Sequence, residues 1–473
     1  MIFSVFAQKM AEKLHFSPNK TQIEAMQLLG SFLFGEGQRD RVFLLRGYAG
    51  TGKTSLVAAL VRLLDEVRVP VTLMAPTGRA AKVFAQMAGH PAFTIHKCIY
   101  RQQKFNVEME GFALTENHRP GVLFICDEAS MISTLNEGSP FGTGNLLDDL
   151  VEYVYATAGC RLLLVGDAAQ LPPVGQKQSP ALDAEQLRGY GLEVMSIELT
   201  EVARQQLDSG ILANATQLRN ILMQGGEALL SLPRVYYKMY QDVRCIDGYE
   251  LLDCLSSSYR NEGLDDTIII TRSNARANRF NLGVRNQILD REEELSPGDR
   301  LLVVKNNYYW GREFDQLPFI ANGDVVTVNR VRSTESFYGF RFARVDVTLS
   351  DYDIDTEVIV MLDTLTVEGP SLPLADQQRL FAEVAQDYPE CRNKRDLYRA
   401  IKENPYFNAL QVKYAYCVTC HKSQGGQWQD VYLDVGYINP DHLGTDFYRW
   451  MYTAFTRARK TLYLVNPSAD MLE

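Results

Sequence analysis

The sequence predicts an α/β protein with parallel sheets and a smaller β-rich insertion. In both halves of the chain, apolar runs typical of buried strands precede helix-like stretches, first at residues 42–45 and 54–64 and later at 267–271 and 274–289. Between residues 299 and 362, β-branched runs follow one another between turn residues, which is typical of a small barrel. Because 473 residues exceed one ordinary core, we expect two to four domains.

The first strand-to-helix connection carries a phosphate-binding pattern. Its letters, GYAGTGKT, match G-x-x-x-x-G-K-[ST]. Gly47, Gly50 and Gly52 allow backbone N–H groups to close round phosphate oxygens, Lys53 would reach the β and γ phosphates, and the Thr54 hydroxyl would hold Mg²⁺. A chance glycine-rich turn is the alternative, but the predicted strand and helix on either side favour a nucleotide site.

Two adjacent carboxylates follow another strand-like run, at residues 123–126. Asp127 can complete a Mg²⁺ shell while Glu128 orients an attacking water, so hydrolysis is the favoured reaction. The alternative is that the two carboxylates only begin the following helix, where negative charge is favourable, and have a structural role. A further run, at residues 161–165, leads to Gln170 at the edge where open parallel sheets bind ligands, which makes Gln170 a candidate sensor of the γ-phosphate.

Composition limits the classes of partner. The net charge of −10 argues against tight non-specific binding of nucleic acid, yet many acids gather between Asp351 and Glu368, where no Lys or Arg occurs, so a narrow channel elsewhere stays compatible with the sequence. No long apolar run or signal peptide is evident, so we expect a cytoplasmic protein without a membrane partner. Residues 417–421 match C-x-x-C-H, but no second Cys or His pair has metal-site spacing, so we expect neither haem nor zinc.

Seven segments in a fixed order carry a family resemblance. Their letters are APTGRAAK, TIH, DEASM, GDAAQLPPV, LTEVARQ, TCHKSQG and YTAFTRA. In this order they resemble the superfamily 1 DNA helicases, and more narrowly the RecD-like and Dda-like branch of 5′ to 3′ enzymes. The resemblance spans nearly the whole chain. It implies two RecA-like P-loop lobes with parallel sheets, a small hairpin insertion in lobe one and an SH3-like β insertion in lobe two.

The resemblance also implies where the domains begin and end. The tail of the β insertion is predicted to be helical, a feature that the family pattern does not explain. The expected ranges are 1–199 for lobe one with its hairpin at about 98–120, 200–299 and 411–473 for the two parts of lobe two, and 300–410 for the SH3-like insertion with helices at 375–386 and 394–403.

ATP and Mg²⁺ are the implied cofactors, with the nucleotide held between the lobes. Lobe two would supply Arg204 and Arg457 as arginine fingers, which stabilise transition-state charge. Gln22 would contact the adenine, and a solvated position in the first turn of a helix is the alternative. Lobe one would supply Lys53, Thr54, Asp127, Glu128 and Gln170.

Single-stranded DNA is the implied substrate and would cross both lobes, contacting small polar groups rather than a dense lysine surface. The two histidines among the implied contacts could instead cap helices or form hydrogen bonds in the core. The implied contacts are Pro76, Thr77 and His96 in lobe one and Thr419, His421 and Gln424 in lobe two.

The hairpin insertion offers a pin that could separate strands. Apolar residues alternate on both sides of a turn at residues 110–111, which is a hairpin pattern. By resemblance, a hairpin at this place splits the duplex, so Phe105 or Phe112 is the candidate ring that stacks on a terminal base. Both rings could instead only anchor the hairpin on lobe one. A second aromatic segment, residues 306–310, could stack on bases but is favoured as barrel core.

The predicted function is an ATP-dependent DNA helicase that translocates 5′ to 3′ on single-stranded DNA and opens duplex junctions. We expect a monomer that acts in DNA replication, repair or recombination, with single-stranded DNA-binding or recombination proteins as partners. The alternative is an ATP-regulated translocase or remodelling subunit of a recombination complex that does not separate strands by itself.

Overall fold

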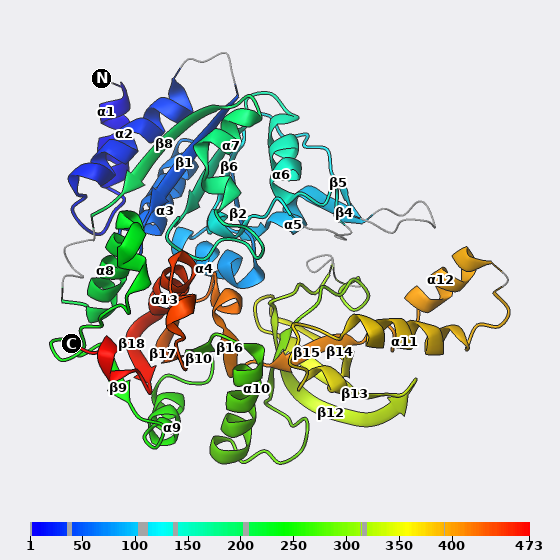
Figure 1. Cartoon of the computed structure of the whole chain (residues 1–473). Helices are drawn as coiled ribbons and strands as arrows, with labels where there is room; N and C mark the ends of the chain where they lie inside the picture. The colour runs from blue at the N-terminus through cyan, green and yellow to red at the C-terminus, as the bar shows by residue number, and fades with distance from the viewer. Residues whose placement is uncertain are drawn as a thin grey trace.

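The computed structural model describes residues 2–35, 40–102, 112–135, 141–201, 208–312, 314, 319–391 and 393–473. Within these ranges the chain forms two α/β lobes, with the N-terminus on lobe one and the C-terminus on lobe two, and a β-barrel with a helical arm beside lobe two (Figure 1). The predicted fold class is therefore confirmed. No helix of the described chain combines the length and the apolar character needed to cross a bilayer.

Lobe one contains a parallel sheet in the strand order β3-β2-β6-β7-β1-β8. Its inner strands are buried on both faces, which is why they read as unbroken apolar runs. Helices α1 to α4 pack on one face and α5 to α7 on the other. The strands are β1 (Arg41–Gly47), β2 (Val71–Ala75), β3 (Ala92–Thr94), β6 (Leu123–Cys126), β7 (Arg161–Gly166) and β8 (Glu193–Leu199). The helices are α1 (Ile2–Ala11), α2 (Lys20–Phe34), α3 (Lys53–Glu66), α4 (Gly78–Ala88), α5 (Ile95–Ile99), α6 (Leu146–Tyr155) and α7 (Ala184–Gly189).

Lobe two contains a second parallel sheet, in the order β16-β10-β17-β18-β9. Helices α8 and α13 pack on one face, and α9 and α10 pack on the other. The strands are β9 (Val243–Ile246), β10 (Thr267–Thr271), β16 (Cys417–Thr419), β17 (Trp428–Asp434) and β18 (Ala458–Val465). The helices are α8 (Gly210–Gln224), α9 (Leu251–Asn261), α10 (Asn274–Gly283) and α13 (Thr445–Phe455).

The insertion is a closed barrel with a helical arm, and its last strand differs from the expected domain boundary. We expected lobe two to resume at residue 411, but β15 pairs with β11 and β14 and closes the barrel. Lobe two resumes only at β16. The barrel strands are β11 (Arg300–Val303), β12 (Val325–Phe337), β13 (Phe340–Leu349), β14 (Ile354–Met361) and β15 (Leu410–Tyr414), and the arm comprises α11 (Leu374–Ala385) and α12 (Lys394–Lys402).

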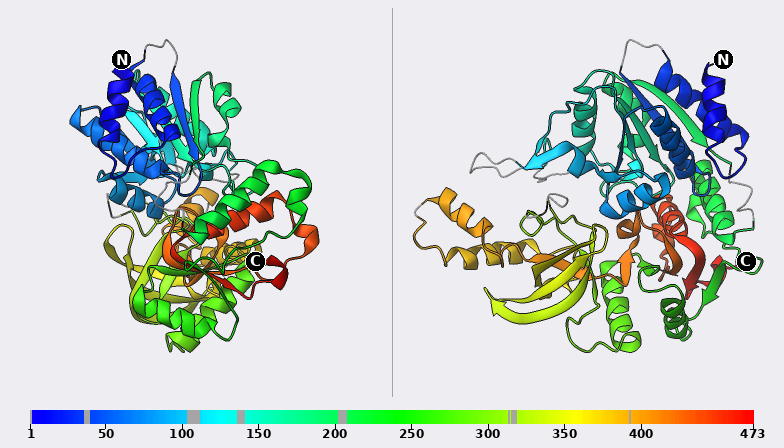
Figure 2. Two further views of the ribbon diagram at one scale, coloured as in Figure 1. Left: turned by 90° about the vertical axis from the view of Figure 1, so that its left-hand side faces the viewer. Right: turned by 180° about the vertical axis from the view of Figure 1, so that it is seen from behind.

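A short hairpin emerges from lobe one where an insertion was expected. Its strands β4 (Tyr100–Gln102) and β5 (Phe112–Leu114) are antiparallel, with Gln102 opposite Phe112. The first strand thus precedes the expected one at residues 105–109, which lie outside the described residues. Figures 1 and 2 show the hairpin and the α11–α12 arm extending toward the same side of the molecule.

Candidate active site between the lobes

A cleft of about 1080 Å³ is lined by both lobes. Its lobe-one wall includes the P-loop before α3 and the segments that follow β6 and β7, and its lobe-two wall includes the end of α13 and the start of β18. Arg204, one of the two predicted arginine fingers, lies outside the described residues. The fold brings together Lys53, Thr54, Asp127, Glu128 and Gln170 from lobe one and Arg457 from lobe two.

The P-loop depends on glycines in the left-handed region. Gly50 has φ 73° and Gly52 has φ 82°, and a Cβ on Gly52 would lie 2.8 Å from Nε2 of Gln22. Helix α3 begins at Lys53, and its first residues line the cleft, so the partial positive charge of its N-terminus is available there. Lys53 Nζ donates hydrogen bonds to two loop carbonyls, at 2.7 and 2.9 Å. The loop has the shape and charge of a phosphate cradle.

Gln22 packs against the P-loop. Its Oε1 accepts a hydrogen bond from the Asn19 N–H at 2.9 Å, as part of the capping box that begins α2. Its Nε2 donates to the Thr51 carbonyl, also at 2.9 Å. The side chain is 1% exposed, which contradicts the solvated alternative. The adenine contact stays a prediction.

The two carboxylates after β6 are held in a specific geometry. Thr54 Oγ1 lies 3.4 Å from Asp127 Oδ2, and the Glu128 N–H donates to Asp127 Oδ1 at 2.9 Å. Glu128 has φ 52°, a left-handed conformation that costs a non-glycine residue roughly 1–2 kcal/mol. Burial, followed by the neighbouring Glu128 carboxylate, raises the pKa of Asp127. A hydroxyl and a carboxylate this close form a donor set that suits Mg²⁺.

The segment after β7 presents a buried amide to the cleft. The Gln170 N–H donates to the Asp167 carbonyl at 3.3 Å, and this hydrogen bond closes a turn between the two residues. Gln170 Oε1 is buried and has no hydrogen-bond partner within the described chain. Leaving such an acceptor unsatisfied costs about 1–3 kcal/mol, so a donor inside the cleft would stabilise it. Gln170 is therefore placed where it can contact a water or a phosphate group.

Tyr452, on α13, contacts lobe one in a way that our sequence reasoning missed. Its hydroxyl donates to Asp167 Oδ2 at 2.6 Å and accepts from the Ala49 N–H of the P-loop at 2.9 Å. The next residue, Thr453, accepts at Oγ1 from the Leu171 N–H at 2.9 Å. The signal available in the sequence was the YTAFTRA segment itself, where both residues stand just before Arg457.

Arg457 brings a positive charge to the lobe-two side of the cleft. It is 2% exposed, and its Nε donates to the Thr453 carbonyl at 3.0 Å. Its other nitrogens bond to the Gly426 carbonyl and the Thr456 hydroxyl, at 3.1 and 3.2 Å. None of these partners is a carboxylate, and no ion pair of Arg457 occurs among the described residues. The guanidinium is thus positioned without a protein counter-charge in a cleft that also holds the P-loop.

A second groove, of about 430 Å³, runs between the lobes and the barrel. It is lined by three of the predicted DNA contacts, Thr77, His421 and Gln424, together with the basic residues Arg79, Arg300 and Lys422. Gln424 is buried, and its Nε2 donates to the Leu171 carbonyl at 2.7 Å, so this side chain also links the lobes. Pro76 and Thr419 do not line this groove.

Two other predicted contacts, His96 and Phe112, lie in an aromatic cluster. The His96 ring is 4.7 Å from the Phe141 ring, and Phe112 is 4.7 Å from Phe141 and 5.0 Å from Tyr308 of the insertion. Phe112 is 6% exposed, which is the arrangement expected of the alternative, a ring that anchors the hairpin. Phe105 lies outside the described residues. The DNA contacts of these residues stay predictions.

The 306–310 segment contributes to packing, as favoured from the sequence. Trp310 packs against the barrel core and against the residues of the arm, and its Nε1 donates to the Asn408 carbonyl at 2.9 Å. Tyr308 packs in the aromatic cluster described above. Tyr309 lies in a different environment, beside a pocket between the barrel and the arm.

Comparison with known families and proteins agrees with this architecture. A family described as an AAA domain matches residues 19–224, and one described as a UvrD-like helicase C-terminal domain matches residues 414–465. The first match covers lobe one from α2 onward and continues through α8 of lobe two, and the second begins at the end of β15 and covers the last part of lobe two. Most residues that line the cleft lie within these two ranges, whereas Phe16 and residues 239–242 do not.

Among individual proteins, the chain is 33% identical over 179 residues to the ATP-dependent RecD2 DNA helicase of Deinococcus radiodurans, covering 37% of this chain and 21% of that protein. It spans about a fifth of the length of that relative. It is 24% identical over 331 residues to the ATP-dependent DNA helicase dda of Enterobacteria phage T4, covering 66% of this chain and 68% of dda. A solved structure of the Pif1 helicase from Bacteroides, in complex with ADP-AlF3 and ssDNA, aligns with 97% of this chain and 95% of that one, at 17% identity and a TM-score of 0.49. Together, the two family matches and these relatives support a superfamily 1 helicase of the RecD-like and Dda-like branch.

Proposed function

We propose that this protein is an ATP-driven motor that translocates 5′ to 3′ on single-stranded DNA and unwinds duplex DNA. The observation that carries the proposal is the cleft itself. A P-loop and two carboxylates of lobe one lie there with the Arg457 guanidinium of lobe two, which has no carboxylate partner among the described residues. Because opposite walls of one cleft come from different lobes, a reaction in the cleft is coupled to lobe movement.

The residues of the cleft fit Mg²⁺ and ATP. Backbone N–H groups of the P-loop and Lys53 would hold the phosphates, and Thr54 with Asp127 would hold the cation. Bound Mg²⁺–ATP would supply the phosphoanhydride that is cleaved and a cation that offsets its charge. Glu128 would orient the attacking water and accept its proton.

The remaining groups act on charge and on position. Gln170 has a free acceptor at Oε1 and would hold the attacking water or sense the γ-phosphate. Arg457 would stabilise negative charge that develops on the transferred phosphoryl group, an effect worth about 10³ to 10⁵ in rate for arginine fingers. Thr453 and Gln424 of lobe two form hydrogen bonds with Leu171 in the segment after β7. A displacement of that segment would therefore be transmitted directly to lobe two.

DNA as the substrate is supported by the groove and by the relatives. Three basic side chains and the predicted contacts Thr77 and His421 line one path between the lobes and the barrel. Both RecD2 and dda are named as ATP-dependent DNA helicases. Because the chain carries a net charge of −10, binding would depend on this path rather than on general charge attraction.

A strand-displacement assay tests the proposal. Duplexes with a 5′ tail, a 3′ tail or no tail are incubated with ATP, and the Lys53→Ala variant serves as control. We expect release of the strand from the 5′-tailed duplex alone, and none with the variant. Equal release from both tails would contradict the proposed direction.

A second candidate is an ATP-regulated translocase or remodelling subunit of a recombination complex that does not separate strands by itself. The 28% identity, over 41% of this chain, to a protein named as a subunit, the RecBCD enzyme subunit RecD of Mycobacterium tuberculosis, favours the subunit role. Displacement of streptavidin from the 3′ end of a biotinylated single strand measures translocation without unwinding. Streptavidin release with no release from the 5′-tailed duplex would favour this second function.

A further inference from the structure

The geometry points to a second nucleic-acid site: we propose that the pocket between the barrel and the α11–α12 arm binds a nucleotide of single-stranded DNA beyond the inter-lobe groove. The pocket measures about 410 Å³, and its walls come from the 305–312 segment, from both arm helices and from Phe112 at the base of the lobe-one hairpin. The inference rests on the proposed function and extends it, since it names where the strand continues after leaving the groove.

Charge in the pocket favours an anion. Three basic residues line the pocket, Lys305, Arg312 and Lys402, and a single acidic residue, Glu403, is among the lining residues described. Glu403 pairs with Arg312 at 2.7 Å. Lys305 Nζ bonds to the neutral Gln377 Oε1 at 3.0 Å and has no carboxylate partner within the described ranges. Burial lowers the pKa of Lys305, so a phosphate group beside it would stabilise the charged amine.

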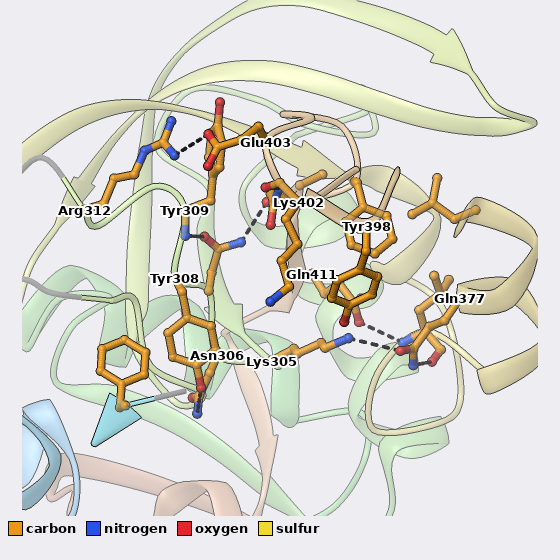
Figure 3. Close-up of a pocket in the computed structure, with 17 residues that line it drawn as sticks. Lys305, Asn306, Tyr308, Tyr309, Arg312, Gln377, Tyr398, Lys402, Glu403 and Gln411 are labelled. Atoms are coloured by element: carbon orange, nitrogen blue, oxygen red, sulfur yellow. Dashed lines mark hydrogen bonds and ion pairs between the residues drawn. The ribbon is translucent and has the colours of Figure 1, made fainter. Parts of the chain in front are cut away.

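Aromatic side chains give the pocket surfaces on which a base can stack. Figure 3 shows Tyr309 and Tyr398 among the side chains that surround it, with Lys305 and Lys402 directed toward its interior. The Arg312 guanidinium lies 4.1 Å from the centre of the Tyr309 ring, and Lys402 Nζ lies 4.9 Å from that of Tyr398. Tyr398 is 46% exposed, so its ring is accessible. A ring beside a cation is the combination that binds single-stranded nucleotides without sequence preference.

The pocket lies beside the inter-lobe groove, and this position favours single-stranded DNA as its ligand. Asn306, which lines the pocket, accepts at Oδ1 from the N–H of Asn322 at 2.7 Å, and Asn322 lines the inter-lobe groove. Lys422, also in the groove, donates to the Asn322 side chain. The pocket and the groove are therefore neighbours on either side of this hydrogen-bonded pair, so a strand that leaves the groove beside Asn322 would pass the pocket. An acidic peptide would match the charge of the pocket but not its continuity with the groove.

The test compares DNA affinity at two lengths. Wild-type protein and the Tyr398→Ala and Lys402→Gln variants are titrated with oligo-dT of about 6 and about 16 nucleotides, since contacts beyond the groove require the longer strand. We expect each variant to bind the long strand about tenfold more weakly and the short strand equally well. Tyr398→Phe keeps the ring and should bind as the wild type does. Tyr249→Ala, which removes a tyrosine that is 94% exposed in lobe two, is the matched control.

The outcomes separate the two proposals. If the wild type fails to bind either strand and hydrolyses ATP no faster with DNA, the proposed function is wrong. If the wild type binds the long strand more tightly than the short one and both pocket variants keep that gain, the pocket inference is wrong while the function stands. If a poly-glutamate peptide binds the wild type but not Tyr398→Ala, and DNA affinity is unchanged in that variant, the pocket binds protein and the inference is overturned.

Discussion

The Tyr452 hydroxyl of lobe two donates a hydrogen bond to Asp167 Oδ2 at 2.6 Å while it accepts one from the Ala49 N–H of the P-loop. One atom thus joins α13 to the two lobe-one segments that form the phosphate side of the cleft. A change in the position of either segment must move this hydroxyl or break one of its bonds. Tyr452 is therefore suited to pass a change at the nucleotide site to lobe two.

Replacing Tyr452 with Phe tests this coupling. The change removes the donor to a buried carboxylate, and we expect it to lower the free energy of unfolding by about 1–3 kcal/mol. We also expect DNA-stimulated ATP turnover to fall about tenfold while basal turnover changes little, because the hydroxyl links the lobes rather than contacting the phosphates. Tyr437→Phe, at a residue 87% exposed in lobe two, is the control. A normal ratio of stimulated to basal turnover in Tyr452→Phe would contradict the coupling.

Arg457→Ala and Arg204→Ala should separate hydrolysis from DNA binding. We expect turnover to fall by about 10³ in each variant, since a cation that stabilises transition-state charge is lost, with affinity for single-stranded DNA nearly unchanged. Arg457→Lys should not restore the rate, because three nitrogens of the guanidinium hold its position through separate bonds. Steady-state ATPase assays and oligonucleotide titration measure the two properties. Loss of DNA affinity with normal hydrolysis would mean that the role is misassigned.

The packing of His96 among aromatic rings should make the stability of lobe one sensitive to acid. Burial lowers the pKa of His96 to about 4 from its ordinary value of 6.5, so between these values the unfolded chain binds a proton that the folded chain does not. The contribution of neutral His96 to the free energy of unfolding is fully present above about pH 6.5. It is lost as the pH falls toward 4, and the loss is about 2 kcal/mol at pH 5. His96→Phe keeps an aromatic ring and should lose about 2 kcal/mol less than the wild type between pH 7 and pH 5, measured by urea unfolding. His118→Phe, at a side chain 77% exposed, should behave as the wild type does.

The two candidate pin rings should respond differently to replacement. Phe112 is buried among Phe141, Tyr308 and Phe319, so Phe112→Ala should lower stability by about 3 kcal/mol and reduce ATPase, translocation and unwinding together. Phe105→Ala should reduce unwinding alone if that ring is the pin. Parallel assays of the three activities decide between them. Selective loss of unwinding in Phe112→Ala would contradict the anchoring role.

Much of the cleft could be predicted because its chemistry requires a fixed spacing of residues. The P-loop letters, the Asp127–Glu128 pair and Gln170 each follow a strand whose apolar run is visible in the sequence, and parallel strands bring their carboxyl ends to one edge. The first four barrel strands and the two arm helices were equally readable from β-branched runs and helical stretches. Local sequence patterns were sufficient wherever a residue interacts mainly with its own strand or loop.

Long-range partners explain what could not be predicted. Tyr452 meets Asp167 and Phe112 meets Tyr308 across distances in sequence that no local pattern reports. The strand-like run at residues 410–418, in which only Gln411 and Lys413 are polar, divides between the barrel and the lobe-two sheet. Both sheets require the same kind of residue, so the boundary was placed too early. In each case the missing information was which elements would meet.

Single-turnover and steady-state ATP hydrolysis by the Glu128→Gln variant, with and without single-stranded DNA, tests the central claim most directly. Glu128 lines the cleft beside Asp127 and is held in a left-handed conformation, with φ 52°, so we assign it to positioning the attacking water. We predict that the variant binds ATP as tightly as the wild type and hydrolyses it at less than about a thousandth of the rate, with or without DNA. Near-normal DNA-stimulated hydrolysis by Glu128→Gln would contradict the account.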